Sequence, residues 1–520
     1  MPLDSLSQAT AGALRSAGSY MADLFTPTIR LGVTGLSRAG KTVLITSLVR
    51  NLIVGGRLPF FRAHAEGRVL RAFLEPQPDD AVPRFDYERH LAAFAADPPD
   101  WPSSTRRISE LRITIEYEPE SYLRRLMGTA RLHVDIVDYP GEWLTDLGLI
   151  DWGYDSWAED AVRLARGRHD VPEAAAFLSF LDGLADPKAS SSASASVPTA
   201  EPDAEQVALT GARLFTAYLA AAKAADGGIQ TLSPGRFLMP GDLEGSPLLT
   251  FFPFSPANQS DVGTHAPHAD DAGAALPSAP DRDELLRLLR RRYESYKAHV
   301  VDPFFRDHFS RIDRQIVLVD LLGALNGGAR AVADLERALE GVLRAFRPGR
   351  NSWLTSLISR RVDHLLFAAT KADHLHHASH DRLEALLRLV TERAASRASA
   401  AGSEVAVMAI AALRATREAT AKHDGELLDC IMGTPLPGER IEARTFDGRT
   451  EVAVFPGDLP EQAADALEAL ARDPAAFEDI AVVRFRPPRL ALLARDGQPA
   501  AMPHIRLDRV LEFLLGDRLE

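Results

Sequence analysis

The chain has 520 residues, 46% of them hydrophobic and 25% charged, which suits a globular protein of about three domains. Its formal net charge of −13 argues against a general nucleic-acid-binding protein, because binding to phosphate backbones needs clustered Lys and Arg. A lone cysteine, Cys430, excludes an internal disulfide and fits a reducing compartment. We therefore expect no nucleic-acid partner, on the ground of charge. We also expect no transmembrane segment, because no apolar run reaches the roughly 18 residues of a spanning helix.

Residues 1–28 are predicted to form an N-terminal helix, because leucine and methionine recur there near helical spacing. The stretch lacks the basic start and continuous apolar run of a secretory signal. It could serve as a membrane-surface or partner helix, but one Arg offers little attraction for anionic lipid. We therefore expect it to pack on the chain's own domain.

Runs rich in apolar and β-branched residues alternate with helical patterns, which predicts an α/β fold with a doubly wound, mostly parallel sheet. Most of the runs are almost continuously apolar, as strands covered on both faces are, whereas the second alternates like an edge or antiparallel strand. The predicted strand runs are 29–35, 108–118, 131–141, 314–323, 364–373 and 404–412.

The α/β domain is predicted to be interrupted. Residues 151–312 lack a matching series of strands and predict a large helical insertion, in which 189–205 and 255–280 are flexible low-complexity loops. Residues 431–520 combine turn residues with short alternating runs, which predicts a small C-terminal β-rich appendage closed by a terminal helix. The two parts of the P-loop domain are then 29–150 and 313–430.

The segment GLSRAGKT matches the phosphate loop G-x-x-x-x-G-K-[ST] in the expected context, after an apolar strand and at the start of a helix. Its backbone N–H groups would surround phosphate oxygens, its lysine would place a charge on the β- and γ-phosphates, and its threonine would be a Mg²⁺ ligand. The predicted nucleotide-binding residues here are Gly35, Leu36, Ser37, Arg38, Ala39, Gly40, Lys41, Thr42 and Val43.

The segment TKAD, from Thr370 to Asp373, follows an apolar strand and favours guanine over adenine. A carboxylate at Asp373 can accept both the N1–H and the 2-amino group of guanine, whereas adenine would present a ring acceptor. Lys371 could lay its stem over the base while its ammonium stays hydrated. The segment AALRAT supplies a weaker signal, a backbone N–H near Ala412 for the guanine carbonyl.

The segment VDIVDYPGEW places Asp138 at the end of a strand, where a carboxylate would hold Mg²⁺. Gly141 follows in a DxxG pattern whose glycine N–H would contact the γ-phosphate, and Glu142 stands where a water-orienting residue belongs. Glu142 is equally well interpreted as a solvated loop acid. Asp320, which ends another strand, is a rival to Asp138, but no DxxG pattern follows it.

The segment WPSSTRR precedes a strand between these two motifs, where a switch threonine would reach both Mg²⁺ and the γ-phosphate. Thr105 is the predicted residue, with Ser104 as the second choice. Arg106 and Arg107 could offset negative charge in a transition state, although a pair of arginines in a loop is more often simply exposed to solvent.

Together, GLSRAGKTVLITSLV, WPSSTR, VDIVDYPGEWLTDL, RQIVLVD, LLFAATKADH and PHIRLDRVLEFLLGD resemble the YcjX-like family of bacterial P-loop proteins, from about residue 30 to the end. The resemblance implies a GTPase-like α/β domain that binds guanine nucleotide (GTP or GDP) and Mg²⁺ in the cytoplasm. The family's association with envelope-stress operons, often beside a membrane-protein gene, implies a membrane-associated protein partner and a place peripheral to the inner membrane.

The sequence thus predicts a GTPase in which Lys41, Glu142 and Thr105 are catalytic and Thr42, Thr105 and Asp138 bind the metal. Two alternatives stay open. One is a nucleotide-gated scaffold with negligible hydrolysis, because a glutamate would add negative charge near the γ-phosphate. The other is an ATPase or kinase that uses the rival strand-end aspartate.

The segment HLHHASH directly after TKAD contains His374, His376, His377 and His380, several of them three or four residues apart. This spacing is compatible with a metal site. No cysteine or carboxylate cluster accompanies them in the sequence, apart from Asp373, so we expect polar loop histidines instead.

Overall fold

The structure is a computed structural model that describes residues 26–35, 39–103, 105, 107–126, 128–168, 171–185, 203–224, 233–255, 282–344, 362–423, 425–441, 444–473, 483–494 and 497–520. Residues 1–25 of the predicted N-terminal helix and most of both low-complexity stretches lie outside this part of the chain. So do five residues of the predicted site region, which are Leu36, Ser37, Arg38, Ser104 and Arg106.

A seven-stranded sheet of order β2-β3-β4-β1-β5-β6-β7 forms the centre of the fold. The strands from β4 to β7 in this order pair in parallel, whereas β3 is antiparallel to both β2 and β4. The structure confirms the predicted α/β class and the mostly parallel sheet. The strands are β1 (Thr28–Gly35), β2 (Val69–Glu75), β3 (Ser109–Tyr117), β4 (Ala130–Asp138), β5 (Arg314–Val319), β6 (His364–Ala369) and β7 (Glu404–Ala409).

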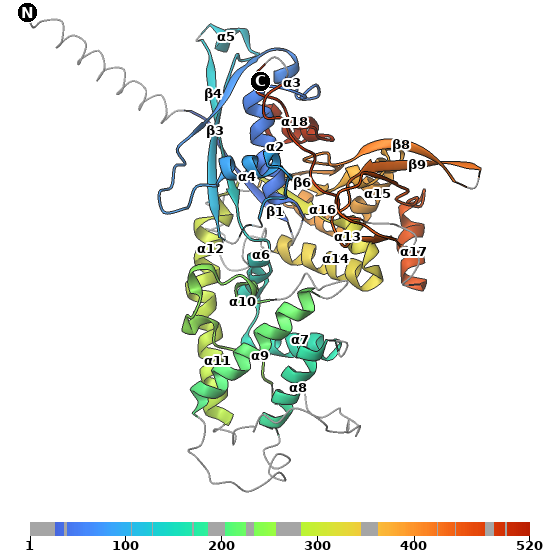
Figure 1. Cartoon of the computed structure of the whole chain (residues 1–520). Coiled ribbons are helices and arrows are strands. Elements are labelled where there is room, and N and C mark those ends of the chain that lie inside the picture. Colours follow the sequence, from blue (N-terminus) through green and yellow to red (C-terminus); the bar gives the residue numbers. More distant parts are fainter. Residues whose placement is uncertain are drawn as a thin grey trace, which may run out of the picture.

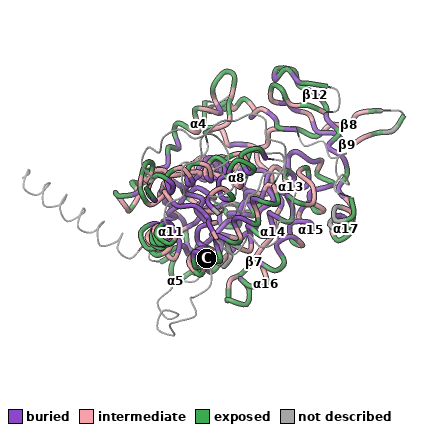
Figure 2. The backbone as a smooth tube through the Cα atoms, turned by 90° about the horizontal axis from the view of Figure 1, so that it is seen from below, coloured by how far each residue is buried: buried purple, intermediate pink, exposed green. Residues whose placement is uncertain are grey.

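Helices cover both faces of the sheet, which explains why its central strands are almost continuously apolar. Ile316 and Leu318 of β5 share a buried cluster with α2 and α18, while Val317 and Val319 share one with α13, α14 and α15. The helices around the sheet are α2 (Lys41–Val54), α3 (Arg62–Ala65), α4 (Tyr87–Ala95), α5 (Tyr122–Arg125), α13 (Leu321–Asn326), α14 (Gly328–Arg344), α15 (His380–Val390), α16 (Glu392–Ala400) and α18 (Leu507–Leu515). Figure 2 shows the buried backbone concentrated in the middle of the molecule.

A helical unit follows β4 and extends away from the sheet (Figure 1). Its core is aromatic: Trp157 stacks on Tyr293 with 5.1 Å between ring centroids, and Phe215 and Phe251 contact the same tryptophan ring edge-on. The unit and its links to the sheet contain α6 (Glu142–Leu147), α7 (Tyr154–Arg166), α8 (Pro172–Ala185), α9 (Ala204–Ala224), α10 (Gly235–Leu238), α11 (Arg282–Tyr296) and α12 (Asp302–Asp307).

A separate antiparallel region is formed near the C-terminus by a three-stranded sheet of order β12-β9-β8 and a two-stranded one. The hairpin of β8 and β9 projects from the molecule (Figure 1). The terminal helix α18, by contrast, packs on the main sheet through Val510 and Leu514. The remaining elements are β8 (Arg417–His423), β9 (Glu426–Gly433), β10 (Arg440–Ile441), β11 (Arg444–Thr445), β12 (Val452–Val454) and α17 (Ala463–Arg472).

Strand β2 was not among the predicted strands. It lies at the edge of the sheet, where only Ala72 among its residues is buried. Its sequence, VLRAFLE, is interrupted by Arg71 and contains a single β-branched residue, so it resembles the other strand runs less closely. Because β2 covers β3, the alternating run 108–118 is an interior antiparallel strand. Among the described residues, no helix is long and apolar enough to cross a membrane.

Candidate functional site

The loops that carry the three predicted motifs meet at one edge of the main sheet. Strands β1, β4, β5, β6 and β7 run in parallel, so their carboxyl ends lie together. The loops that follow these strands carry the phosphate-loop motif, the DxxG pattern and the TKAD motif. This edge is where open α/β sheets bind ligands.

In the described part of the phosphate loop, two positions have a conformation or a close packing contact that favours glycine. Gly40 adopts a left-handed conformation with φ of 86°, and α2 begins at the next residue, Lys41. A Cβ on Gly35 would lie 2.9 Å from the Cβ of Leu318, so only glycine fits without a shift. Lys41 Nζ donates a hydrogen bond to the Gly35 carbonyl at 3.0 Å, which folds the lysine back over the loop.

Thr42, Thr105 and Asp138 come together although 63 residues separate the two threonines. Thr105 Oγ1 lies 3.4 Å from Thr42 Oγ1 and donates to Asp138 Oδ2 at 2.5 Å. Burial raises the pKa of Asp138 to about 6, although the nearby Lys41 charge and the Thr105 hydrogen bond oppose the rise. Asp138 Oδ1 is buried and has no hydrogen-bond partner among the described residues. A buried carboxylate oxygen lacking a partner, beside two hydroxyls, fits Mg²⁺, whose ligands are oxygens.

A pocket of about 400 Å³, partly open to solvent, joins the phosphate loop to the TKAD motif. It is lined by several residues that the sequence had singled out, namely Ala39, Gly40, Val43, Thr370, Lys371, Asp373 and Ala412. It is also lined by Leu44, Leu318 and Ile410, which the sequence had not indicated as site residues, and by Ala411 and Leu413 of the segment AALRAT. The apolar patterns around the first three residues indicated only burial.

Asp373 is held in place by the start of the C-terminal region. Its Oδ2 accepts a hydrogen bond from the Ala415 N–H at 2.8 Å, and the Thr416 hydroxyl donates to its backbone carbonyl. The residue is only 4% exposed. One carboxylate oxygen is therefore occupied by the protein, and the other has no hydrogen bond within the described residues.

Lys371 has a left-handed backbone with φ of 62°, and its ammonium pairs with Asp320. Asp320 also accepts from the Gly323 N–H at 3.1 Å and so caps α13. The rival strand-end acid therefore interacts with the TKAD motif. Asp138, in contrast, is hydrogen-bonded to Thr105, which lies next to Thr42.

Glu142 begins α6 and pairs with Lys223, near the end of α9 in the helical unit. The Glu142 side chain is only 10% exposed, which argues against the interpretation as a solvated loop acid. Burial raises the pKa of Glu142, but Lys223, helped by Lys41, outweighs this and leaves the pKa below its ordinary value. No sequence pattern marks Lys223 as the partner of Glu142, because 81 residues separate the two.

A second buried acid fixes α6 to the helical unit. Asp146 accepts hydrogen bonds from the Gly235 N–H at 2.6 Å and from the Tyr296 hydroxyl at 2.6 Å. Burial raises the pKa of Asp146 to about 6 in spite of these bonds. Gly141, which directly precedes α6, is buried but does not line the pocket. Through Glu142 and Asp146, α6 therefore contacts α9, α10 and α11.

Known proteins resemble this chain over almost its whole length. Residues 29–519 match the model of the YcjX-like family, DUF463. A protein of Escherichia coli (strain K12) named "Ras-like GTPase YcjX" is 35% identical over 496 residues, covering 94% of this chain and 96% of its own. A Shewanella oneidensis protein of the same name is 32% identical over 504 residues, covering 95% of each chain. The chain therefore belongs to the YcjX-like family of P-loop proteins.

Proposed function

We propose that this protein binds guanine nucleotide with Mg²⁺ and hydrolyses GTP to GDP and phosphate as a conformational switch. The observation that carries the proposal is that one pocket is lined by both the phosphate loop and Asp373. The relatives' printed name, Ras-like GTPase, supports the same nucleotide and reaction.

The base would lie at the end of the pocket formed by the TKAD motif. The free oxygen of Asp373 would accept hydrogen bonds from the N1–H and 2-amino group of guanine, and adenine offers neither donor. Lys371 lines the pocket while its ammonium is held by Asp320, so its stem can cover a base face. The apolar lining from Leu318 and Ile410 suits a flat heterocycle.

The phosphates would lie at the opposite end. The N–H groups at the start of α2 and the charge of Lys41 would bind the phosphate oxygens. Thr42, Thr105 and Asp138 would hold Mg²⁺, directly or through water, and the ion would neutralise charge on the β- and γ-phosphates. Gly141 would sense the γ-phosphate through its N–H, and the loss of that phosphate would release the Thr105 loop.

Helix α6 would carry this change into the helical unit, because its first residue pairs with Lys223. The same ion pair favours the second candidate function, a nucleotide-gated scaffold with negligible hydrolysis. A Glu142 carboxylate engaged by Lys223 is not free to orient water. Single-turnover hydrolysis with Mg²⁺ separates the two functions: a rate no higher than that of GTP in buffer alone would favour the scaffold.

Competition between GTP and ATP for the purified protein tests the nucleotide directly. We expect GTP to displace a fluorescent guanine nucleotide far more effectively than ATP does. Lys41→Ala should remove most of the binding while the fold is retained. Tighter binding of ATP than of GTP, or unchanged affinity in Lys41→Ala, would contradict the proposal.

A further inference from the structure

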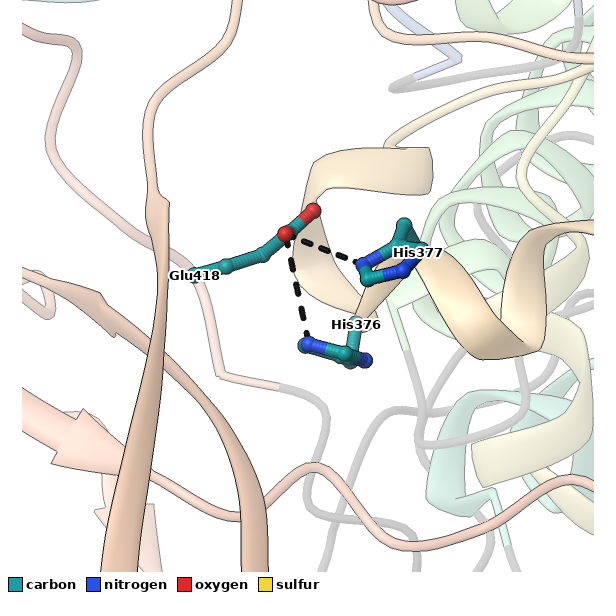
Figure 3. A group of neighbouring side chains, drawn as sticks. All are labelled: His376, His377 and Glu418. Carbon is teal, nitrogen blue, oxygen red and sulfur yellow. Dashed lines mark hydrogen bonds and ion pairs between the residues drawn. The ribbon is translucent and has the colours of Figure 1, made fainter.

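A cluster of two histidines and a carboxylate lies outside the nucleotide pocket (Figure 3). His376 and His377 belong to the loop after β6, and Glu418 belongs to β8. One ligand atom from each lies within 4.8 Å of the others. The spacing of the histidines was compatible with a metal site, but the sequence did not indicate the carboxylate that joins them, because it is about 40 residues further along the chain.

The distances in the cluster suit a shared cation. Glu418 Oε2 lies 3.0 Å from His377 Nδ1 and 3.9 Å from His376 Nε2. Bonds of about 2.0–2.1 Å from Zn²⁺ in tetrahedral geometry place neighbouring ligand atoms about 3.3 Å apart. These two separations lie on either side of this value, and no pair of ligand atoms in the cluster is more than 4.8 Å apart, so side-chain rotations could bring all three around one ion.

Two charged side chains next to the cluster, Asp429 and Arg414, can orient its proposed ligands. His376 Nδ1, the ring atom opposite the proposed ligand atom, is buried and has no hydrogen bond within the described part of the chain, and Asp429 Oδ2 of β9 lies 3.5 Å from it. A carboxylate behind a ligating imidazole fixes its tautomer and raises its basicity. Arg414 Nη2 lies 3.4 Å from Glu418 Oε1, whereas Oε2 faces the imidazoles and is hydrogen-bonded to His377 Nδ1, a contact that the ion would replace.

We propose that His376, His377 and Glu418 bind a divalent transition-metal ion, with Zn²⁺ as the natural candidate. Two imidazole nitrogens and one carboxylate match the preferences of Zn²⁺ and not those of Mg²⁺, which selects oxygen ligands. The His377 side chain is 66% exposed, so water has access to a fourth position.

The ion would link two segments that already touch. Asp373 precedes His376 by three residues and is hydrogen-bonded to Ala415, which precedes Glu418 by three. A bound ion would thus cross-link the loop after β6 to the first strand of the small sheet. The site does not depend on nucleotide, so it can be tested whether or not GTP binds.

The test is a titration of the full-length protein, stripped of metal and freed of any affinity tag, with Zn²⁺ in excess Mg²⁺. The excess Mg²⁺ occupies oxygen-ligand sites, and Co²⁺ in place of Zn²⁺ gives a visible spectrum that reports imidazole ligation. We expect one Zn²⁺ per chain. Affinity should fall at least 100-fold in His376→Ala and Glu418→Gln, and about 10–100-fold in Asp429→Asn, which removes only the group behind the ligand.

The matched control is His299→Ala, which removes an exposed histidine from the helical unit, away from the cluster. It should bind Zn²⁺ as the unaltered chain does. Circular dichroism of each variant shows whether it is folded. The proposal is overturned if the unaltered chain binds no Zn²⁺ at micromolar concentration, or if the folded cluster variants bind it as tightly as His299→Ala does.

Discussion

Replacing Lys223 by Met should destabilise the contact between α6 and α9. The substitution keeps an apolar stem but removes the charge that pairs with Glu142. Glu142 would remain largely buried with no opposite charge in contact with it. Removing one partner of a buried ion pair lowers the free energy of unfolding by about 3–5 kcal/mol. We expect about 3 kcal/mol here, because 19% of the Lys223 side chain is exposed to solvent and the pair is not fully buried.

A double-mutant cycle isolates the interaction between the two side chains. Glu142→Gln in the Lys223→Met background removes the unpaired charge. The double variant should therefore be about 2 kcal/mol more stable than the sum of the two single-variant losses in unfolding free energy predicts. Urea unfolding followed by tryptophan fluorescence reports on this region, because three of the five tryptophans, Trp143, Trp152 and Trp157, lie in α6, in α7 or between them.

The matched control is an exposed ion pair in the same helical unit, Arg290 with Asp155, whose side chains are 48% and 62% exposed. Arg290→Met should cost less than about 1 kcal/mol, because exposed pairs contribute little. The reasoning fails if Lys223→Met costs no more than Arg290→Met. It also fails if the two single effects simply add in the double variant.

Three further substitutions test the elements around the site. Gly235→Ala would place a Cβ 1.9 Å from the Glu142 carbonyl oxygen, so it should displace α10 from α6 and lower stability by about 1–3 kcal/mol in urea unfolding. The buried Asp146 binds a proton more tightly in the folded chain, so raising the pH from about 4 to about 6 should destabilise the unaltered chain relative to Asp146→Asn, by up to about 3 kcal/mol. Thr105→Val removes a hydroxyl from the proposed metal site and should lower the preference for GTP over GDP about tenfold in competition binding.

Two neighbouring substitutions serve as controls. Gly153→Ala adds a Cβ where no atom lies within 4 Å and should leave the unfolding midpoint almost unchanged. Ser103→Ala removes an exposed hydroxyl from the same loop as Thr105 and should bind both nucleotides normally. Equal effects in Gly235→Ala and Gly153→Ala, or a pH-independent difference between Asp146→Asn and the unaltered chain, would contradict the structural interpretation.

Local residue patterns in the sequence were sufficient to predict the parallel part of the sheet and the main nucleotide motifs. Apolar runs and the helices after them predicted the parallel part of the sheet, and motif order predicted that the phosphate loop and Asp373 would share a pocket. Edge strand β2 escaped prediction because Arg71 interrupts its apolar residues and only one of its residues is β-branched, so it carries a weak strand signal. The N-terminal helix prediction falls on residues outside the described part of the chain and stays a prediction.

Contacts between distant segments could not be predicted where no motif marks the residues that meet. Lys223 is an ordinary helix residue by sequence, and only packing of the helical unit on α6 pairs it with Glu142. Glu418 likewise reaches His376 and His377 only because β8 passes the loop after β6. No single stretch of the chain contains either arrangement, so no motif could mark it.

Competition binding of guanine and xanthine nucleotides to Asp373→Asn tests the central claim most directly. Xanthine carries a carbonyl where guanine has its 2-amino group, so an asparagine amide can donate to it. Each hydrogen bond to a charged group contributes about 1.5–3 kcal/mol, so we expect GTP affinity to fall at least about 100-fold while affinity for xanthosine triphosphate rises. If Asp373→Asn is folded and still binds GTP as tightly as the unaltered chain, with no gain for the xanthine nucleotide, Asp373 does not read the base.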